Sequence, residues 1–175
     1  MTGVLLVGGA SSRFGSPKAL ARLEGETLAE RGWRILGEAF AHRLAVGKGD
    51  EELPFPVVDD GIEVRAPIAG VVAGLDASGT DLALLLPVDC PLVTAAVLLT
   101  LADACDGADA AVPQTGPLPG AYRKTALPVL QRRLAAERLS LREALSELDT
   151  RTVDLDEAVL ANVNTADDLR RLVGE

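Results

Sequence analysis

Short apolar runs alternate along this chain with longer stretches in which apolar residues recur every three or four positions. Most of the short runs are apolar throughout, and the most apolar of them covers residues 82–86 within "DLALLLPVDC". Such runs are typical of strands that are buried on both faces of a sheet. The predicted strands are 3–7, 43–46, 55–58, 82–86, 109–112 and 150–155.

The longer stretches have the periodicity of helices that bury one face. Pro67 suits the first turn of a helix, and three residue pairs have the spacing of a capping box, in which two residues cap the helix start reciprocally. These pairs are Thr27 with Glu30, Ser140 with Glu143, and Thr165 with Asp168. The predicted helices are 27–40, 67–77, 94–105, 125–139, 141–148 and a terminal helix that begins after residue 165.

This alternation of strands and helices predicts an α/β fold. Strands that are apolar throughout belong in a mainly parallel sheet with helices on both faces, which makes three layers, α/β/α. A chain of 175 residues suits one ordinary domain, and this chain contains no repeat, low-complexity tract or linker. We therefore expect residues 1–175 to form a single domain.

The charge balance argues against polyanionic partners. The chain has 26 acidic residues against 17 lysines and arginines, which gives a net charge of −9. Proteins that hold nucleic acid by its backbone carry a basic patch, whereas the cations of this chain are scattered. We expect neither nucleic acid nor an anionic membrane as a partner. A small anionic ligand is still compatible, because its site needs only a few local cations and backbone N–H groups.

The N-terminal region and the cysteines indicate a cytoplasmic location. No apolar run approaches the roughly 20 residues of a membrane span, and Gly8 and Gly9 interrupt the first apolar stretch. We therefore expect no secretory signal and no membrane span. Cys90 and Cys105 have no metal-binding spacing, so the expectation is two reduced thiols.

The loop after the first strand, "GGASSRFGSPK", is rich in glycine and other small residues. Open parallel sheets bind ligands beyond the C-terminal ends of their strands, which is where this loop begins. Gly8 and Gly9 let the backbone approach a ligand, and Arg13 and Lys18 supply cations for phosphate oxygens. The loop matches neither the P-loop nor the dinucleotide fingerprint. The alternative is a plain strand-to-helix turn with two solvated cations.

Asp89 follows the most apolar strand, at the same predicted edge of the sheet. A carboxylate at the end of a buried strand is costly to desolvate without a partner. Mg²⁺ is a natural partner, because it binds one or two carboxylates together with phosphate oxygens. The alternative is an aspartate that caps the turn before Pro91. A phosphate-binding loop and a metal-binding acid at one edge favour the functional interpretation of both.

Five blocks of the sequence follow the order of blocks in a known family. The first, "LLVGGASSRFGSPKA", is similar to the signature Leu-x-Gly-Gly-x-Ser-x-Arg-Met/Phe-Gly-x-x-Lys. The others are "APIAG" (66–70), "LPVDCP" (86–91), "PLPGAYRK" (117–124) and "NVNTADDL" (162–169). In these blocks the chain resembles the molybdenum cofactor guanylyltransferases over nearly its whole length, residues 3–169.

The resemblance implies a nucleotidyltransferase with a Rossmann-like fold. Such an enzyme joins GMP from GTP to the terminal phosphate of molybdopterin and releases pyrophosphate, using Mg²⁺. By the same resemblance, Leu6, Val7, Gly8 and Gly9 would lie under the nucleotide. Asp60, after the third strand, would match a nucleotide contact of the family.

The resemblance also implies the catalytic groups. Arg13 and Lys18 would hold the nucleotide phosphates, and Asp89 would bind both the nucleotide and Mg²⁺. These charges suit the chemistry, because one phosphate attacks another and cations must neutralise the charge that develops. Asn162 and Asn164 match an Asn-x-Asn that family members place near the pterin.

Three positions depart from the family pattern. Ala66 replaces a glycine, and Pro17 stands where many members have an aspartate. Gly47 falls after the second strand, where some relatives have an asparagine that contacts the base. This leaves recognition of the base by backbone groups, or a different choice of nucleotide, as alternatives. Related cytidylyltransferases have Ala-Gly where this chain has Gly8–Gly9, which favours GTP.

Two other functions are compatible with the sequence. One is transfer of CMP to molybdopterin, or of another nucleotide to a different phosphorylated acceptor. The other is a nucleotide-binding regulatory module without turnover.

We expect a monomer whose product passes to a molybdoenzyme or its chaperone. Tyr122 and Arg123 either face the acceptor or are a plain strand residue and a solvated charge, and Cys90 is expected to be a small packing residue.

Overall fold

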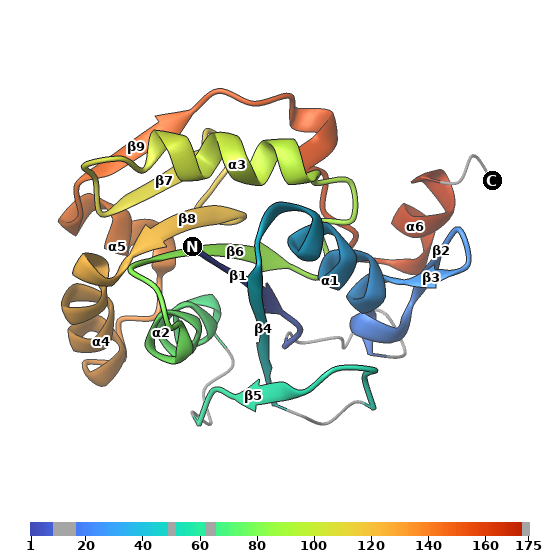
Figure 1. Cartoon of the computed structure of the whole chain (residues 1–175), viewed down its shortest axis with the longest axis horizontal. Helices are drawn as coiled ribbons and strands as arrows, with labels where there is room; N and C mark the ends of the chain where they lie inside the picture. The colour runs from blue at the N-terminus through green and yellow to red at the C-terminus, as the bar shows by residue number, and fades with distance from the viewer. Residues whose placement is uncertain (9–16, 49–51, 62–65, 173–175) are drawn as a thin grey trace.

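The computed structural model describes residues 1–8, 17–48, 52–61 and 66–172. Within these residues the chain forms a seven-stranded sheet and a short two-stranded ribbon (Figure 1). The strands of the sheet are β1 (Thr2–Leu6), β4 (His42–Gly47), β5 (Val57–Asp59), β6 (Leu82–Pro87), β7 (Ala110–Pro113), β8 (Gly120–Arg123) and β9 (Thr150–Val153). The ribbon pairs β2 (Arg22–Leu23) with β3 (Glu26–Thr27).

Helices cover both faces of the sheet. The α-helices of the described residues are α1 (Leu28–Ala39), α2 (Pro67–Ala77), α3 (Ala95–Ala104), α4 (Leu127–Ala135), α5 (Leu141–Ala144) and α6 (Ala166–Leu172). Short 3₁₀ turns cover Lys18–Leu20, Lys124–Ala126, Leu145–Glu147 and Glu157–Leu160. Helices α1 and α3 pack on one face, and α2 and α4 on the other (Figure 1). The predicted three-layer α/β/α architecture is therefore confirmed.

The position of β6 at the centre of the sheet explains why its sequence is apolar throughout. Leu84 and Leu86 belong to the core on the α1 and α3 side, whereas Ala83 and Leu85 belong to the core on the α2 and α4 side. Successive side chains of a strand point to opposite faces, so a strand covered on both sides has no solvent-facing position. All four of these residues are at most 1% exposed.

The strand order places a topological switch at the centre of the sheet. The order is β5-β4-β1-β6-β8-β7-β9. Strands β5, β4, β1 and β6 run parallel, while β8 is antiparallel to both of its neighbours, β6 and β7. From β1 the chain goes first to β4 on one side and later crosses to β6 on the other. The C-terminal ends of β1 and β6 therefore flank the point at which such sheets bind ligands.

The local predictions agree with most of these elements. The capping box of α1 is confirmed, since Thr27 Oγ1 accepts from Glu30 N at 3.1 Å and Glu30 Oε2 accepts from Thr27 N at 2.9 Å. The helix predicted over 125–139 is shorter, because its first turn is a 3₁₀ turn and α4 ends at Ala135. Strand β8 was not predicted. Its sequence "GAYR" is short and begins with glycine, which weakens any strand signal.

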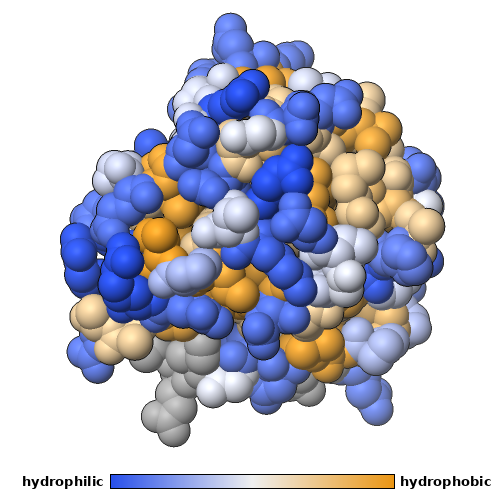
Figure 2. Space-filling model, turned by 60° about the vertical axis from the view of Figure 1, so that its left-hand side comes forward, coloured by the Kyte–Doolittle hydropathy of each residue, from blue (hydrophilic) through white to orange (hydrophobic). Residues whose placement is uncertain are grey.

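On the side shown in Figure 2, hydrophilic residues separate several apolar areas of the surface. None of the helices in the described parts of the chain has the length and apolar character needed to cross a lipid bilayer.

Candidate active site

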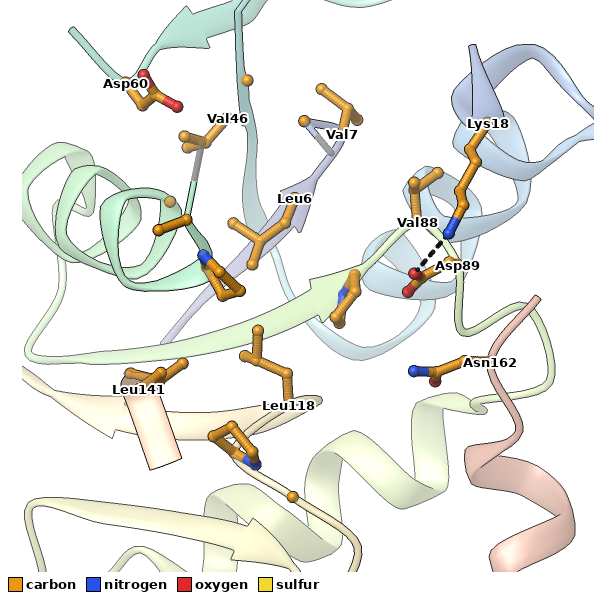
Figure 3. Close-up of a pocket in the computed structure, with 18 of the residues that line it drawn as sticks. Leu6, Val7, Lys18, Val46, Asp60, Val88, Asp89, Leu118, Leu141 and Asn162 are labelled. Carbon is orange, nitrogen blue, oxygen red and sulfur yellow. Dashed lines mark hydrogen bonds and ion pairs between the residues drawn. The ribbon is translucent and has the colours of Figure 1, made fainter. Parts of the chain in front are cut away.

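A cavity of about 680 Å³ lies at the C-terminal ends of β1, β4, β5 and β6. Apolar side chains from β1 and β4 line it, among them Leu6 and Val46, and Val7 and Gly8 continue this lining beyond β1 (Figure 3). Charged groups gather at separate places around this apolar surface: Lys18 lies beside Asp89, and Asp60 lies apart from them (Figure 3). The cavity therefore has the shape and polarity of a site for a ligand with distinct apolar and charged parts.

The switch point between β1 and β6 holds a cation and an acid. Val88 N donates to Leu6 O at 3.0 Å, so the ends of the two strands stay together. Lys18 Nζ donates to Asp89 Oδ2 at 3.2 Å, and these side chains are 16% and 24% exposed. The structure thus brings together two of the predicted catalytic residues, which are 71 positions apart in the chain. Gly9 and Arg13, also predicted for this site, lie outside the described residues.

The Asn-x-Asn segment docks onto this pair. Val163 N donates to Asp89 O at 2.8 Å, and Lys18 Nζ donates to Asn164 Oδ1 at 2.9 Å. Asn162 lines the cavity from the same segment (Figure 3). One lysine therefore connects the first loop, the end of β6 and the C-terminal segment. The family resemblance implied that both asparagines lie near the pterin, whereas in the structure the Asn164 carboxamide contacts Lys18.

Cys90 has a more specific role than packing. Its thiol donates to Asn162 Oδ1 at 3.0 Å. Burial and the neighbouring Asp89 carboxylate raise the pKa of the Cys90 thiol, so the thiol keeps the proton that it donates. This bond fixes the orientation of the Asn162 carboxamide, because a carboxamide oxygen that accepts from a buried donor directs its amino group elsewhere.

The cap of α6 holds the same segment from the other side. Asp168 Oδ2 accepts from the backbone N–H groups of Asn164 and Thr165, each at 2.9 Å, and Asp168 N donates to Thr165 Oγ1 at 3.1 Å. The predicted capping box is therefore confirmed. These bonds also lower the pKa of the Asp168 carboxyl, with the bond from Asn164 N as the largest cause.

A second charged pair lines the cavity beyond β4 and β5. Lys48 Nζ donates to Asp60 Oδ1, and these side chains are 21% and 12% exposed. Asp60 N also donates to Gly47 O at 3.2 Å, which keeps the two strand ends together. The sequence analysis identified Asp60 but missed Lys48. The rule that ligands bind beyond strand ends could have found it, since Lys48 directly follows β4.

Gly47 lies where a side chain has no space. A Cβ atom on Gly47 would be 2.7 Å from Val7 Cγ2 and 3.2 Å from Gly8 N. Real Cβ atoms do not approach other atoms at the first of these distances, so a substitution would require Val7 to move. The glycine at this position therefore matches the close packing of the neighbouring strand end.

The opposite wall of the cavity comes from the second half of the chain. It consists of 115–118, after β7, and 139–142, at the start of α5. Two bonds shape it: Tyr122 Oη donates to Pro117 O at 2.7 Å, and Arg142 Nη2 donates to Thr115 O at 2.9 Å. Tyr122 is fully buried, so it supports the wall without lining it.

Arg123 does not face the cavity either. Its guanidinium pairs with Asp81 at 2.6 Å and donates to Cys105 O at 3.2 Å, at the other end of β6 and β8. Tyr122 is therefore the plain strand residue of the second interpretation, whereas Arg123 neither faces the acceptor wall nor is a solvated charge, because it is ion-paired and mostly buried.

The donor set at Asp89 suits a hard divalent cation that is shared with a ligand. In the described stretches of the chain, no cluster of three or more histidine, cysteine, aspartate or glutamate residues forms a metal cage. Mg²⁺ often uses one or two protein carboxylates and completes its shell with water and phosphate oxygens. The partly exposed Asp89 carboxylate beside the Lys18 ammonium fits that mode of binding.

In this mainly parallel open sheet, Lys18 and Asp89 lie at the switch point, where doubly wound α/β proteins bind their ligands. The chain matches the family model of the MobA-like NTP transferase domain over residues 3–153. It belongs to this family, and it is therefore a nucleotidyltransferase with the predicted Rossmann-like fold.

Curated relatives and solved structures agree with this assignment. The chain is 32% identical to a probable molybdenum cofactor guanylyltransferase from Chloroflexus aggregans, over 97% of this chain and 92% of the relative. It is also 32% identical to the protein of that name from Bacillus subtilis, over 94% and 90% of the two chains. The fold matches molybdopterin-guanine dinucleotide biosynthesis protein A from Archaeoglobus fulgidus, with a TM-score of 0.84, 24% identity and coverage of 98% and 96%.

The same fold occurs in an enzyme that uses another nucleotide. The 2-C-methyl-D-erythritol 4-phosphate cytidylyltransferase from Thermus thermophilus superposes with a TM-score of 0.75 at 18% identity, over 98% of each chain. Similarity of the overall fold therefore does not distinguish guanylyl from cytidylyl transfer.

Proposed function

We propose that this protein is a molybdenum cofactor guanylyltransferase, which transfers GMP from GTP to the terminal phosphate of molybdopterin and releases pyrophosphate. The observation that carries the proposal is the Lys18–Asp89 pair at the switch point of the sheet, in a cavity of about 680 Å³. The relatives' names supply the acceptor and the nucleotide. We further propose that residues 1–175 act as one nucleotidyltransferase domain.

The nucleotide and the acceptor would occupy different parts of the cavity. The triphosphate would lie at Lys18 and Asp89, over Leu6, Val7 and Gly8, with Gly9 and Arg13 contributing from the same loop. The nucleoside would extend toward Asp60, which lies apart from that pair in Figure 3. The wall formed by 115–118 and 139–142, together with Asn162, is then left for the acceptor.

The reaction brings two anions together. An oxygen of the acceptor phosphate attacks the α-phosphorus of GTP, a new P–O bond forms, and the bond between that phosphorus and the pyrophosphate oxygen breaks. Lys18 would exchange its bond to Asp89 for bonds to phosphate oxygens, keep its bond to Asn164, and neutralise part of the negative charge. Asp89 would hold Mg²⁺, which when bound supplies further charge neutralisation at the phosphates. No protein nucleophile is needed.

Asn162 and Asn164 have different roles in this proposal. Asn162, oriented by Cys90, would present its amino group to the acceptor. Asn164 would act indirectly by orienting Lys18. A cytoplasmic location, a monomeric state and a molybdoenzyme or chaperone that receives the product stay predictions.

The test is to supply purified protein with molybdopterin, Mg²⁺ and each of GTP, CTP, ATP and UTP in turn, and to measure pyrophosphate release. We expect GTP to be used with the highest kcat/KM and release to require molybdopterin. Equal use of CTP, or a preference for it, would contradict the guanylyl assignment. Binding of GTP without any turnover would instead favour the regulatory module.

A further inference from the structure

The proposed phosphate chemistry gives the Lys48–Asp60 pair no role, although Asp60 marks the nucleoside end of the cavity. Both side chains line the cavity and both are more than three-quarters buried. Figure 3 shows Asp60 apart from Lys18 and Asp89, with Val46 and Leu6 between them. The pair is therefore poorly placed to serve the phosphates that Lys18 and Asp89 would hold, and it lies instead where the nucleoside would extend.

The packing of β4 explains why a lysine could act here. At position 47 a side chain would collide with Val7, so the last residue of the strand can offer only its backbone. Lys48 is the next residue, and its side chain reaches back to the Asp60 carboxylate across the ends of β4 and β5. A polar contact that position 47 cannot make is thus available one residue further along the chain.

We propose that Lys48 and Asp60 together read the base of the nucleotide, and that Lys48 determines the preference for guanine. This inference rests on the proposed guanylyl transfer. Guanine alone among the common bases presents two adjacent N–H donors, N1–H and N2–H₂, next to the acceptor O6. A carboxylate matches the two donors, and an ammonium bonded to that carboxylate lies beside them, at O6.

The hydrogen-bonding capacity of the pair suffices for this role. An ammonium has three donors and a carboxylate accepts about four hydrogen bonds, so each group can hold the other and a ligand at once. Lysine is one of the side chains that recognise guanine O6 in other settings. Adenine and cytosine carry an amino group where guanine has O6, so either base would direct a donor at the Lys48 ammonium. The pair would then discriminate by leaving buried charges unsatisfied.

The test compares equilibrium binding of GTP, ITP and ATP, each with Mg²⁺, to the wild-type protein and its variants. Inosine keeps O6 and N1–H but lacks the 2-amino group. We expect Lys48→Met to raise the Kd of GTP and of ITP by about 10- to 100-fold each, and the Kd of ATP by less than about threefold. We expect Asp60→Asn to remove the preference for GTP over ITP. Lys48→Arg should keep the preference for GTP.

Lys124→Met is the matched control, because Lys124 is exposed and its backbone N–H pairs with Asp81 at the opposite end of β6. It should change none of the three affinities. An equal loss of GTP, ITP and ATP binding in Lys48→Met would mean that Lys48 contacts the ribose or the phosphates, and would overturn the inference.

A thermal melt shows whether Lys48→Met folds. If it does not, the affinities of the wild-type protein and of Lys48→Arg for GTP, ITP and ATP test the inference. Equal wild-type affinity for GTP and ATP would then overturn the inference, and so would loss of GTP selectivity in folded Lys48→Arg. The proposed function fails separately, when the wild-type protein does not release pyrophosphate from GTP with molybdopterin. If the wild-type protein turns over GTP but Lys48→Met keeps the same preference for GTP over ATP, the proposed function stands. Only the role of Lys48 in base recognition is then overturned.

Discussion

Replacing Lys18 by methionine separates a binding role of this residue from a structural one. The variant keeps the apolar stem and removes the ammonium that bonds to Asp89 at 3.2 Å and to Asn164 at 2.9 Å. An ion pair this close to solvent contributes only about 1 kcal/mol to stability. For a domain of this size we therefore expect the Tm to fall by about 2–4 °C.

The expected effect on nucleotide binding is larger. Hydrogen bonds to charged groups are worth about 1.5–3 kcal/mol, which corresponds to a roughly 10- to 100-fold increase in the Kd of GTP. The variant should also bind Mg²⁺ more readily without nucleotide, because the ammonium no longer competes for the Asp89 carboxylate. Titration of GTP and of Mg²⁺ into folded protein, with thermal melts alongside, measures all three quantities.

Lys124→Met is the control, because it removes a lysine charge at a surface position away from the cavity. A fall of more than about 10 °C in the Tm of Lys18→Met, with the GTP affinity of the folded fraction unchanged, would refute the reasoning. Lys18 would then be a structural residue that joins three parts of the chain, and the phosphate site would have to lie elsewhere in the cavity.

Three further predictions concern the same cavity. Asp89→Asn should lose Mg²⁺-dependent pyrophosphate release while its Tm stays within a few degrees of the wild type, and near-normal turnover in the folded variant would remove Asp89 from the metal site. Gly47→Asn should destabilise the fold by about 1–3 kcal/mol through overpacking against Val7, and an unchanged denaturant midpoint would show that the strand ends adjust without cost. Asn164→Ala should lower kcat/KM by about fivefold, about 1 kcal/mol, because Lys18 loses the Asn164 carboxamide as an acceptor. Its Tm should hardly change if the backbone bond to Asp168 persists, so a large drop in Tm would assign Asn164 a structural role instead.

The sequence by itself determined the elements and the edge of the sheet that carries the site. Fully apolar runs such as 82–86 can only be satisfied between two layers of helices, and capping boxes define helix starts within a few residues. These are local relationships, so a single chain without its fold already contains them. Lys18 and Asp89 were singled out because one follows a glycine-rich loop and the other a buried strand, and the family resemblance then gave both a role.

Only the tertiary structure decided which groups meet. Lys18 bonds to Asn164 across 146 positions, and Lys48 reaches Asp60 from the neighbouring strand end. Strand β8 forms because β6 and β7 offer it two partners, although its own sequence carries little strand signal. Tyr122 is buried in the core and Arg123 is paired with Asp81, so neither faces the acceptor wall. Such contacts depend on strand order and on the packing of side chains between distant segments, neither of which leaves a trace in local hydrophobic pattern.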